Sequence, residues 1–161
     1  MRPFMISLWY DTEAEQAAKF YTSIFKDGKI LSTNYFGKEG FEFHQKPAGS
    51  VLSVEFIANG QTFIAVNGGP HFKFNEAISF MVTCETQKEI DEYWDKLTAG
   101  GGKGVQCGWL KDKFGMSWQV TPTIMEKIQK APDSPGKSRA MTEMFNQVKF
   151  DIEKLRKAFE G

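Results

Sequence analysis

The chain carries one residue pattern twice, and this repeat limits the folds that it can adopt. Residues 5–25 and residues 77–97 both run from a short apolar segment into a stretch with helical periodicity. At a shift of 72 positions, Ile6 matches Ile78, and most apolar positions of the two stretches coincide. A duplicated strand-and-helix unit predicts two equivalent modules. Positions that match between the copies are where we expect a shared site.

The first half is predicted to form a strand, a helix and three further strands. Thr12-x-x-Glu15 is typical of a capping box, and apolar residues recur at helical spacing after it. Asn59-Gly60 is the strongest short signal for a β-hairpin. The polar, glycine-bearing stretch 37–49 is expected to be a loop. The predicted strands are residues 5–10, 29–36, 50–57 and 61–66.

The second half repeats this order. Thr86-x-x-Glu89 is a second capping box, and Asp112 is expected in a solvated turn before the last strand. The two capping boxes are 74 positions apart, whereas the strands match at 72. This difference indicates a connection at residues 83–85 that is two residues longer than its counterpart. The predicted strands are residues 77–82, 103–111 and 117–121.

A tail follows the repeat. Residues 123–130 predict a short helix, and residues 131–137, with two prolines and a glycine, predict a linker or surface loop. Asp151 is a predicted N-cap of the last helix, with Phe150 and Leu155 placed as a hydrophobic staple. The apolar stripe of this helix is typical of packing on the parent domain or on a second subunit.

Composition excludes some classes of function. Twenty Lys and Arg balance 20 Asp and Glu, so the chain lacks the basic footprint of a nucleic-acid-binding protein. No apolar run approaches the roughly 20 residues of a membrane span, and no membrane partner is expected. Cys84 and Cys107 lack metal-type spacing and are expected to be free thiols. A cytoplasmic location is the expectation.

Four stretches carry a resemblance to a known family: LWYDTEAEQAAKFYTSIF, NGGPHFKF, ISFMVTCETQKEIDEYW and CGWLKDKFGMSWQVTP. With the two predicted modules, they resemble the vicinal oxygen chelate superfamily, which includes glyoxalase I, extradiol dioxygenases and bleomycin-resistance proteins. In particular they resemble its PhnB-like branch, often labelled demethylubiquinone methyltransferase-like. The resemblance implies an α+β fold of two tandem β-α-β-β-β modules, and a homodimer. It places the paired modules within residues 1–122, at about 4–67 and 77–122, and leaves residues 123–161 as a helical extension.

The methyltransferase label finds no support in the residues. A Rossmann-type methyltransferase carries a glycine-rich loop directly after its first strand. Here Asp11-Thr12-Glu13 follows the first predicted strand, and the first glycine is Gly28. The triple glycine at residues 100–102 follows a helix and ends it. We therefore expect no chemistry with S-adenosylmethionine.

The resemblance implies where a metal would bind. Enzymes of the superfamily hold a divalent ion between facing sheets, through residues on the first and last strands of each module. Matching the repeats places these positions at Ser7, Ile64, Ser79 and Gln119. This set has neither a carboxylate nor an imidazole, the donors that bind first-row divalent ions well. No metal and no cofactor is therefore predicted.

A small organic ligand is the alternative occupant of the same face. Strand alternation directs Ser7, Trp9, Ser79 and Met81 toward a cavity. The segment that links the modules supplies a polar anchor and apolar walls, which suit a small-molecule site. The candidate ligand-binding residues are Ser7, Trp9, Ile64, Asn67, Phe72, Phe74, Ser79, Met81, Trp109 and Gln119.

Three functions follow from these observations. The first is a metal-free protein that binds a small organic molecule. The second is a metal-dependent lyase, isomerase or dioxygenase whose relocated ligands include Gln119, His71 or Glu55. The third is a partner-binding protein that docks through its tail. His44 and His71 both fall in predicted loops, where a solvated histidine is the usual outcome.

Overall fold

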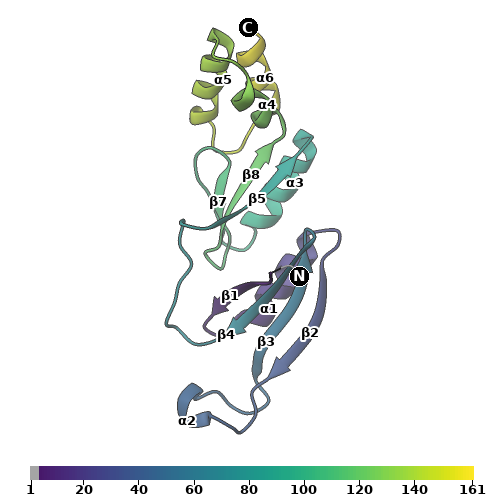
Figure 1. Ribbon diagram of the computed structural model, residues 1–161, viewed down its shortest axis with the longest axis vertical. Coiled ribbons are helices and arrows are strands. Elements are labelled where there is room, and N and C mark those ends of the chain that lie inside the picture. Colours follow the sequence, from purple (N-terminus) through teal and green to yellow (C-terminus); the bar gives the residue numbers. More distant parts are fainter. Residues whose placement is uncertain (1–3) are drawn as a thin grey trace. The chain divides into compact units, whose positions relative to one another are not determined.

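The structure, a computed structural model, describes residues 4–161. The chain divides into two compact units, one up to Lys73 and the other from Phe74 onward. Each unit contains a four-stranded sheet with a helix packed on one face (Figure 1). The predicted α+β fold of two β-α-β-β-β modules with a helical tail is confirmed.

The first unit follows the predicted order and adds a short helix. The strands are arranged β1-β4-β3-β2, with β1 parallel to β4 and the other pairs antiparallel. Asn59 and Gly60 both have positive φ, as the expected hairpin turn requires. The elements are β1 (Ile6–Tyr10), α1 (Ala14–Ile24), β2 (Lys29–Tyr35), α2 (Phe41–His44), β3 (Val51–Ala58) and β4 (Gln61–Asn67).

Helix α1 packs on one face of this sheet through residues at helical spacing. Ala17 and Ala18 are fully buried, and the ring of Tyr21 stacks on Phe56 with centroids 6.0 Å apart. Phe56 in turn stacks on Phe63 at 5.2 Å. Burying one such side chain contributes about 1.5–3 kcal/mol. Each sheet has one face covered by the helix after its first strand. We call the opposite face of the sheet the open face.

The predicted capping box at the start of α1 is wrong. The N-cap is Glu13, and no side-chain cap is formed there; the carboxylate of Glu13 instead accepts from the backbone N–H of Thr12 at 2.9 Å. The N–H of Ala14 donates to the side-chain oxygen of Asn67 at 2.8 Å. An amide from the end of β4 therefore satisfies a helix-start donor that the local sequence leaves open.

The expected loop at residues 37–49 contains α2. His44 organises this segment, because its ring packs against that of Phe36, tilted by 35° at a centroid distance of 4.5 Å. Its Nδ1 accepts from the N–H of Lys46 at 2.9 Å, so Nε2 carries the proton and lies 3.1 Å from the carbonyl of Glu39. The histidine was expected to be solvated, but both ring nitrogens are used to fold this segment.

The second unit repeats the module and adds the tail. Its sheet has the order β5-β8-β7-β6, again with the first and last strands parallel. Thr86 and Glu89 form the predicted capping box, and the single strand expected at 103–111 is divided in two. The elements are β5 (Ser79–Cys84), α3 (Gln87–Thr98), β6 (Lys103–Gly104), β7 (Trp109–Lys111), β8 (Ser117–Pro122), α4 (Ile124–Lys130), α5 (Pro135–Asn146) and α6 (Ile152–Glu160).

The hydrogen bonds correct the expected match of 72 between the first strands. The N–H of Gly68 donates to the carbonyl of Tyr10, and that of Thr123 donates to Cys84 in the same place of the second module. Tyr10 and Cys84 are 74 positions apart, so the sequence match was displaced by two residues. A two-residue shift keeps every side chain on its face, which is why the predicted faces hold. The two-residue extension expected at residues 83–85 does not exist.

Asp112 is also placed differently from the expectation. It lies in the predicted turn but is buried, whereas a solvated carboxylate was expected. Its carboxylate accepts from the N–H groups of Phe114 and Met116 and from the indole of Trp118 at 2.8–3.1 Å. These three donors compensate the side chain of Asp112 for its removal from water.

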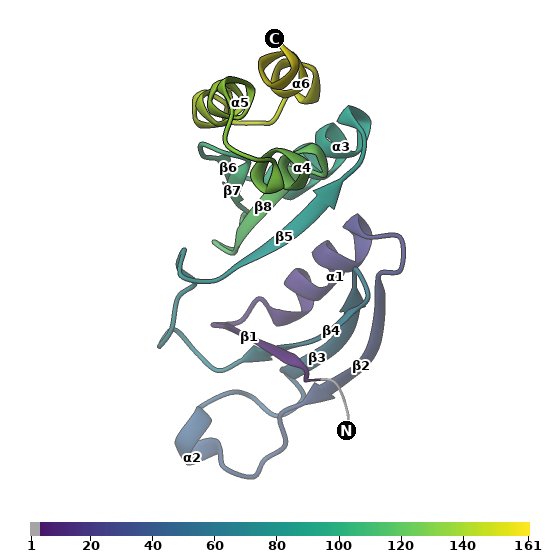
Figure 2. The ribbon, with the colours of Figure 1, turned by 45° about the horizontal axis from the view of Figure 1, so that its top comes forward.

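The tail packs on its own unit. Its helices α4, α5 and α6 gather beyond the carboxyl end of β8 (Figure 2). The side-chain amide of Gln87 on α3 attaches the tail through two hydrogen bonds. Its nitrogen donates to the carbonyl of Phe150 and its oxygen accepts from the N–H of Ile152, each at 3.0 Å. Asp151 caps α6 as predicted, and the expected linker is shortened because α5 begins at Pro135. Contact with the parent domain is thereby confirmed.

We predict that Asn67→Ala lowers the free energy of unfolding by about 2 kcal/mol, because it removes a helix cap and leaves two backbone groups without partners. Besides capping α1, the Asn67 amide donates to the carbonyl of Val51 at 2.9 Å. Thermal melting is the measurement. Asn34→Ala is the matched control, since that amide makes one 3.3 Å hydrogen bond to Ser53. Equal melting temperatures of the two variants would contradict the assigned role.

Candidate functional site

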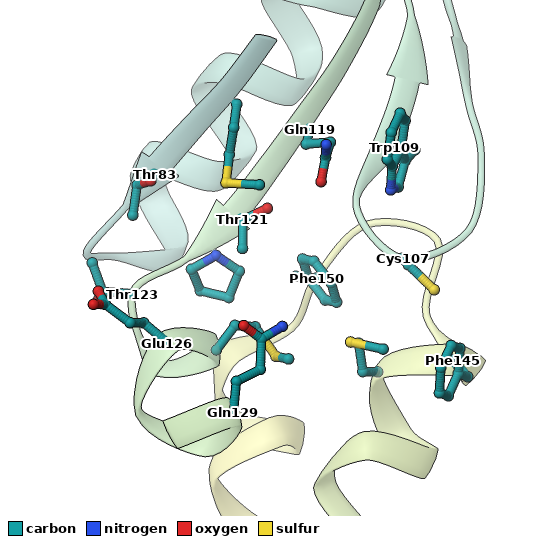
Figure 3. A pocket seen from close by; sticks show the side chains of 14 residues that line it. Thr83, Cys107, Trp109, Gln119, Thr121, Thr123, Glu126, Gln129, Phe145 and Phe150 are labelled. Carbon is teal, nitrogen blue, oxygen red and sulfur yellow. The ribbon is translucent and has the colours of Figure 1, made fainter. Parts of the chain in front are cut away.

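A cavity of about 510 Å³ lies within the second unit, between the open face of its sheet and the tail (Figure 3). Strands β5, β7 and β8 supply one wall, and α4, α5 and the segment before α6 supply the other. The volume lies in the range of roughly 300–1,000 Å³ that small-molecule sites occupy. The lining residues are Met81, Thr83, Cys107, Trp109, Gln119, Thr121, Pro122, Thr123, Met125, Glu126, Gln129, Met144, Phe145 and Phe150.

Gln119 is the polar group at the centre of the strand wall. Its side-chain nitrogen donates to the hydroxyl of Ser79 at 2.8 Å, which fixes the amide. The oxygen then points into the cavity (Figure 3). Gln119 pairs with Met81 on β5 and with Trp109 on β7, so these three residues form one row across the sheet.

Aromatic side chains form much of the remaining wall. Phe150 is 2% exposed and rests against the backbone at Gly108, where a Cβ atom would lie 2.4 Å from its ring. Gly108 also has a φ of +76°, a conformation that favours glycine. The N–H groups of Cys107 and Gly108 donate to the carbonyls of Gln147 and Val148. The loop between β6 and β7 is therefore fastened to the tail.

The lining carries little charge. Glu126 is its one ionisable side chain apart from the thiol of Cys107, and it lies at the exposed rim. The ammonium of Lys130 donates to this carboxylate and holds its pKa below the usual range. Among the residues that line the cavity there is no Lys, Arg or His. The cavity therefore offers no counter-charge to an anionic ligand.

Several residues predicted for the site meet in this cavity. Met81, Trp109 and Gln119 line it, and Ser79 supports it through the hydrogen bond to Gln119. Phe74 belongs to the same unit and is half-buried, but it is not part of the lining.

The remaining candidates lie in the first unit. Ser7 and Ile64 are cross-strand partners on the open face of its sheet. Trp9 donates from its indole to the carbonyl of Gly69 at 2.8 Å and meets Phe72 edge-on at 5.1 Å. Asn67 is buried, and both ends of its amide bind backbone groups. It has a structural role, and it is not among the residues that line the cavity of the second unit.

The corrected repeat changes one of the four positions implied for a metal. Since Ser7 pairs with Ile64 and Met81 pairs with Gln119, Met81 replaces Ser79 in the set. The set still has no carboxylate or imidazole. Within residues 4–161, no group of three or more His, Cys, Asp and Glu side chains is placed to hold a metal ion.

The two cysteines differ in their surroundings. Cys84, the last residue of β5, is fully buried, and this burial, reinforced by the charge of Glu89, raises the pKa of its thiol to about 11. Such a thiol stays protonated at neutral pH and is a poor nucleophile. Cys107 is half-buried at the edge of the cavity.

The tail residues of the cavity were missed at the level of sequence. Met125, Met144, Phe145 and Phe150 lie outside the repeat, so no matching position pointed to them. The predicted hydrophobic staple at Phe150 is the one sequence signal that involves a tail residue of the cavity, and it indicates only packing of the last helix.

Comparison with known proteins identifies relatives of this chain. The family described as 3-demethylubiquinone-9 3-methyltransferase matches residues 2–121. A PhnB protein from Bacillus cereus, described as a 3-demethylubiquinone-9 3-methyltransferase, has a similar structure, with 33% identity and a TM-score of 0.65. The similarity covers 76% of this chain and 100% of that one.

More distant structures share the fold. The fosfomycin resistance protein FosX from Mesorhizobium loti has 10% identity and a TM-score of 0.54, over 80% of this chain and 98% of its own. FosX from Listeria monocytogenes, solved with Mn(II) and sulfate, has 14% identity and a TM-score of 0.51, over 80% and 96%. A search among curated proteins found no match. In the part of the chain that the structure describes, no helix has the length and apolar character needed to span a membrane.

We predict that Gly108→Ala loosens the tail, because its Cβ collides with the ring of Phe150. Gly115→Ala is the matched control, since Gly115 has a similar φ of +85° and no atom within 4 Å of the added Cβ. Both variants carry backbone strain of about 1–2 kcal/mol, and overpacking adds about 1–3 kcal/mol at Gly108 alone. Limited proteolysis near residues 131–134 is the measurement. We expect faster cleavage in Gly108→Ala than in Gly115→Ala. Equally slow cleavage in both variants would show that the packing of Phe150 does not require a glycine at position 108.

Proposed function

This chain belongs to the family described as 3-demethylubiquinone-9 3-methyltransferase, a PhnB-like branch of the vicinal oxygen chelate superfamily, and we propose that it binds a small organic molecule without a metal ion. One observation carries the proposal. Met81, Trp109 and Gln119, which strand pairing places in one row, line a cavity large enough for such a molecule.

The family description alone does not give this chain a methyltransferase activity. The chain enters α1 from β1 through Asp11-Thr12-Glu13, with no glycine at the turn. Close approach of a backbone to a cofactor depends on glycines at such a turn in the Rossmann methyltransferases. The sheets also pair their first and last strands in parallel within a short module, which is a different architecture.

The metal-free mode is favoured by the donor set. A manganese-bearing structure, that of FosX from Listeria monocytogenes, shares the fold. In the present chain the row at Ser7 and Ile64 offers one hydroxyl, and the row at Met81 and Gln119 offers a thioether and an amide. Hydroxyl and thioether groups are weak ligands for Mn, Fe or Zn in the absence of anionic partners.

A metal-dependent enzyme is the second candidate, and one residue favours it. Glu55 of β3 lies directly across from Ile64, on the open face that also carries Ser7. It is half-buried, and its side chain has no hydrogen bond or ion pair with any residue that the structure describes. Carboxylates are common protein ligands of divalent ions. One carboxylate and one hydroxyl are fewer protein donors than such an ion usually takes, so the binding function is preferred.

We predict saturable binding of N-phenyl-1-naphthylamine, an uncharged aromatic probe whose fluorescence rises in an apolar site. Trp109→Leu should weaken this binding about tenfold, because an aromatic wall of the cavity is lost. Tyr35→Leu is the matched control, since Tyr35 is an exposed aromatic residue on β2 in the other unit. An unchanged dissociation constant in Trp109→Leu would place the probe elsewhere and contradict the assigned site.

A metal titration separates the two candidate functions. For the binding protein, adding Mn²⁺, Zn²⁺, Ni²⁺ or Fe²⁺ to chelator-treated protein should leave the melting temperature unchanged. A rise in melting temperature that disappears in Glu55→Gln, but persists in Glu42→Gln, would make the enzyme the better candidate. Glu42 is a suitable control because it lies on the exposed helix α2.

A further inference from the structure

We infer that the ligand of the second-unit cavity is an uncharged, planar aromatic molecule that carries a hydroxyl group. This inference rests on the proposed binding function and adds the chemical class of the ligand. Three properties of the lining lead to it: its charge, its content of sulfur and aromatic rings, and the direction of two polar groups.

The charge of the lining excludes anions. A phosphate, phosphonate or carboxylate that enters an apolar cavity loses hydration, which must be compensated by a cation or several aligned donors. The lining contains no Lys, Arg or His, and its carboxylate, Glu126, would repel an anion. Glu126 is already paired with Lys130 at the rim, so it does not require a cationic ligand either.

The sulfur content favours a flat ring over an aliphatic molecule. Three of the seven methionines and one of the two cysteines line this cavity. Thioethers are polarizable and contact aromatic rings favourably, by about 0.3–1.5 kcal/mol each. Trp109, Phe145 and Phe150 add ring faces and edges, which pair with another ring in stacked or edge-on geometry.

A bare soft metal ion is a poorer match to the same sulfur atoms. The cavity measures about 510 Å³, whereas a single water molecule takes up roughly 30 Å³ of liquid. The sulfur-bearing residues come from β5, α4, α5 and the loop before β7, with aromatic side chains among them. The sulfur atoms are therefore spread around a space that is large enough for a molecule with more than one ring.

The hydroxyl group is inferred from the polar groups of two residues that are cross-strand neighbours. The Gln119 oxygen points into the cavity as an acceptor, because its amide nitrogen donates to Ser79. Trp109 lies beside Gln119 across the β7–β8 pair, and its indole N–H has no acceptor among the residues that the structure describes. A hydroxyl donates one hydrogen bond and accepts another, so it is the single ligand group whose capacity matches one acceptor and one donor.

Competition against N-phenyl-1-naphthylamine tests each property with a matched compound at pH 7. We expect 1-naphthol to displace the probe at least tenfold more tightly than three relatives. 1-Methoxynaphthalene lacks the donor, decahydro-1-naphthol lacks the aromatic rings, and 1-naphthoate carries a negative charge. A tenfold ratio corresponds to about 1.4 kcal/mol, the size of one hydrogen bond.

Variants at one position test the hydrogen bond itself. Gln119→Leu should weaken 1-naphthol about tenfold and leave 1-methoxynaphthalene unchanged, since only the first compound donates. Gln119→Glu keeps an acceptor at the same place, so it should restore the preference for 1-naphthol. Gln16→Leu is the control, because Gln16 is an exposed glutamine on α1 and does not line the cavity. Circular dichroism of each variant verifies that the fold is retained.

The outcomes separate the ligand class from the proposed function. If the probe binds but all four compounds compete equally, or 1-naphthoate competes best, the ligand class is wrong and the binding function stands. If neither the probe nor any of the four compounds binds by ligand-observed NMR, the proposed function itself is overturned. A preference for 1-naphthol that survives Gln119→Leu also contradicts the assigned hydrogen bond.

Discussion

In each unit the first strand pairs in parallel with the last, and every other feature of the module depends on this contact. The pairing joins residues that are 57 positions apart in the first unit, Ser7 and Ile64, and 38 apart in the second, Met81 and Gln119. The helix that follows the first strand packs on one face of the resulting sheet. The pairing also aligns polar and apolar residues of distant segments on the open face, where a ligand can reach them.

The tail turns the open face of the second unit into a cavity. An open sheet face alone has no opposite wall, and α4, α5 and Phe150 supply one. Their position is held by polar contacts with specific geometry: Gln87 binds the backbone on both sides of Asp151, and Lys149 forms a 2.8 Å ion pair with Asp91 of α3. The hydrogen bond from Lys149 holds the pKa of Asp91 below its usual range. Ligand contact and tail attachment therefore involve the same short segment of chain.

Periodicity and turn chemistry predicted the modules because these signals are local. The Asn59-Gly60 hairpin, the Thr86 capping box and the Asp151 cap all depend on residues within three or four positions. The failures were long-range. The start of α1 is capped by Asn67, 53 positions away, and the register between β5 and β8 is set by backbone hydrogen bonds that side-chain identities do not encode. Face alternation does not depend on that error, so the predicted residues Met81, Trp109 and Gln119 do line the cavity. The tail residues have no counterpart in the repeat and were not predicted.

The cap on α1 has a consequence for folding during synthesis. A helix that starts with Ser, Thr or Asp at its own N-cap satisfies its first donors as soon as those residues leave the ribosome. In α1 one of these donors, the N–H of Ala14, is satisfied only when Asn67, the last residue of β4, is in place. The contact closes a loop of more than 50 residues, and the conformational entropy lost in closing it disfavours the contact until the strands of the sheet have paired. The helix and the sheet of the first unit are thus expected to form together, in one cooperative step that begins only after about 70 residues have emerged.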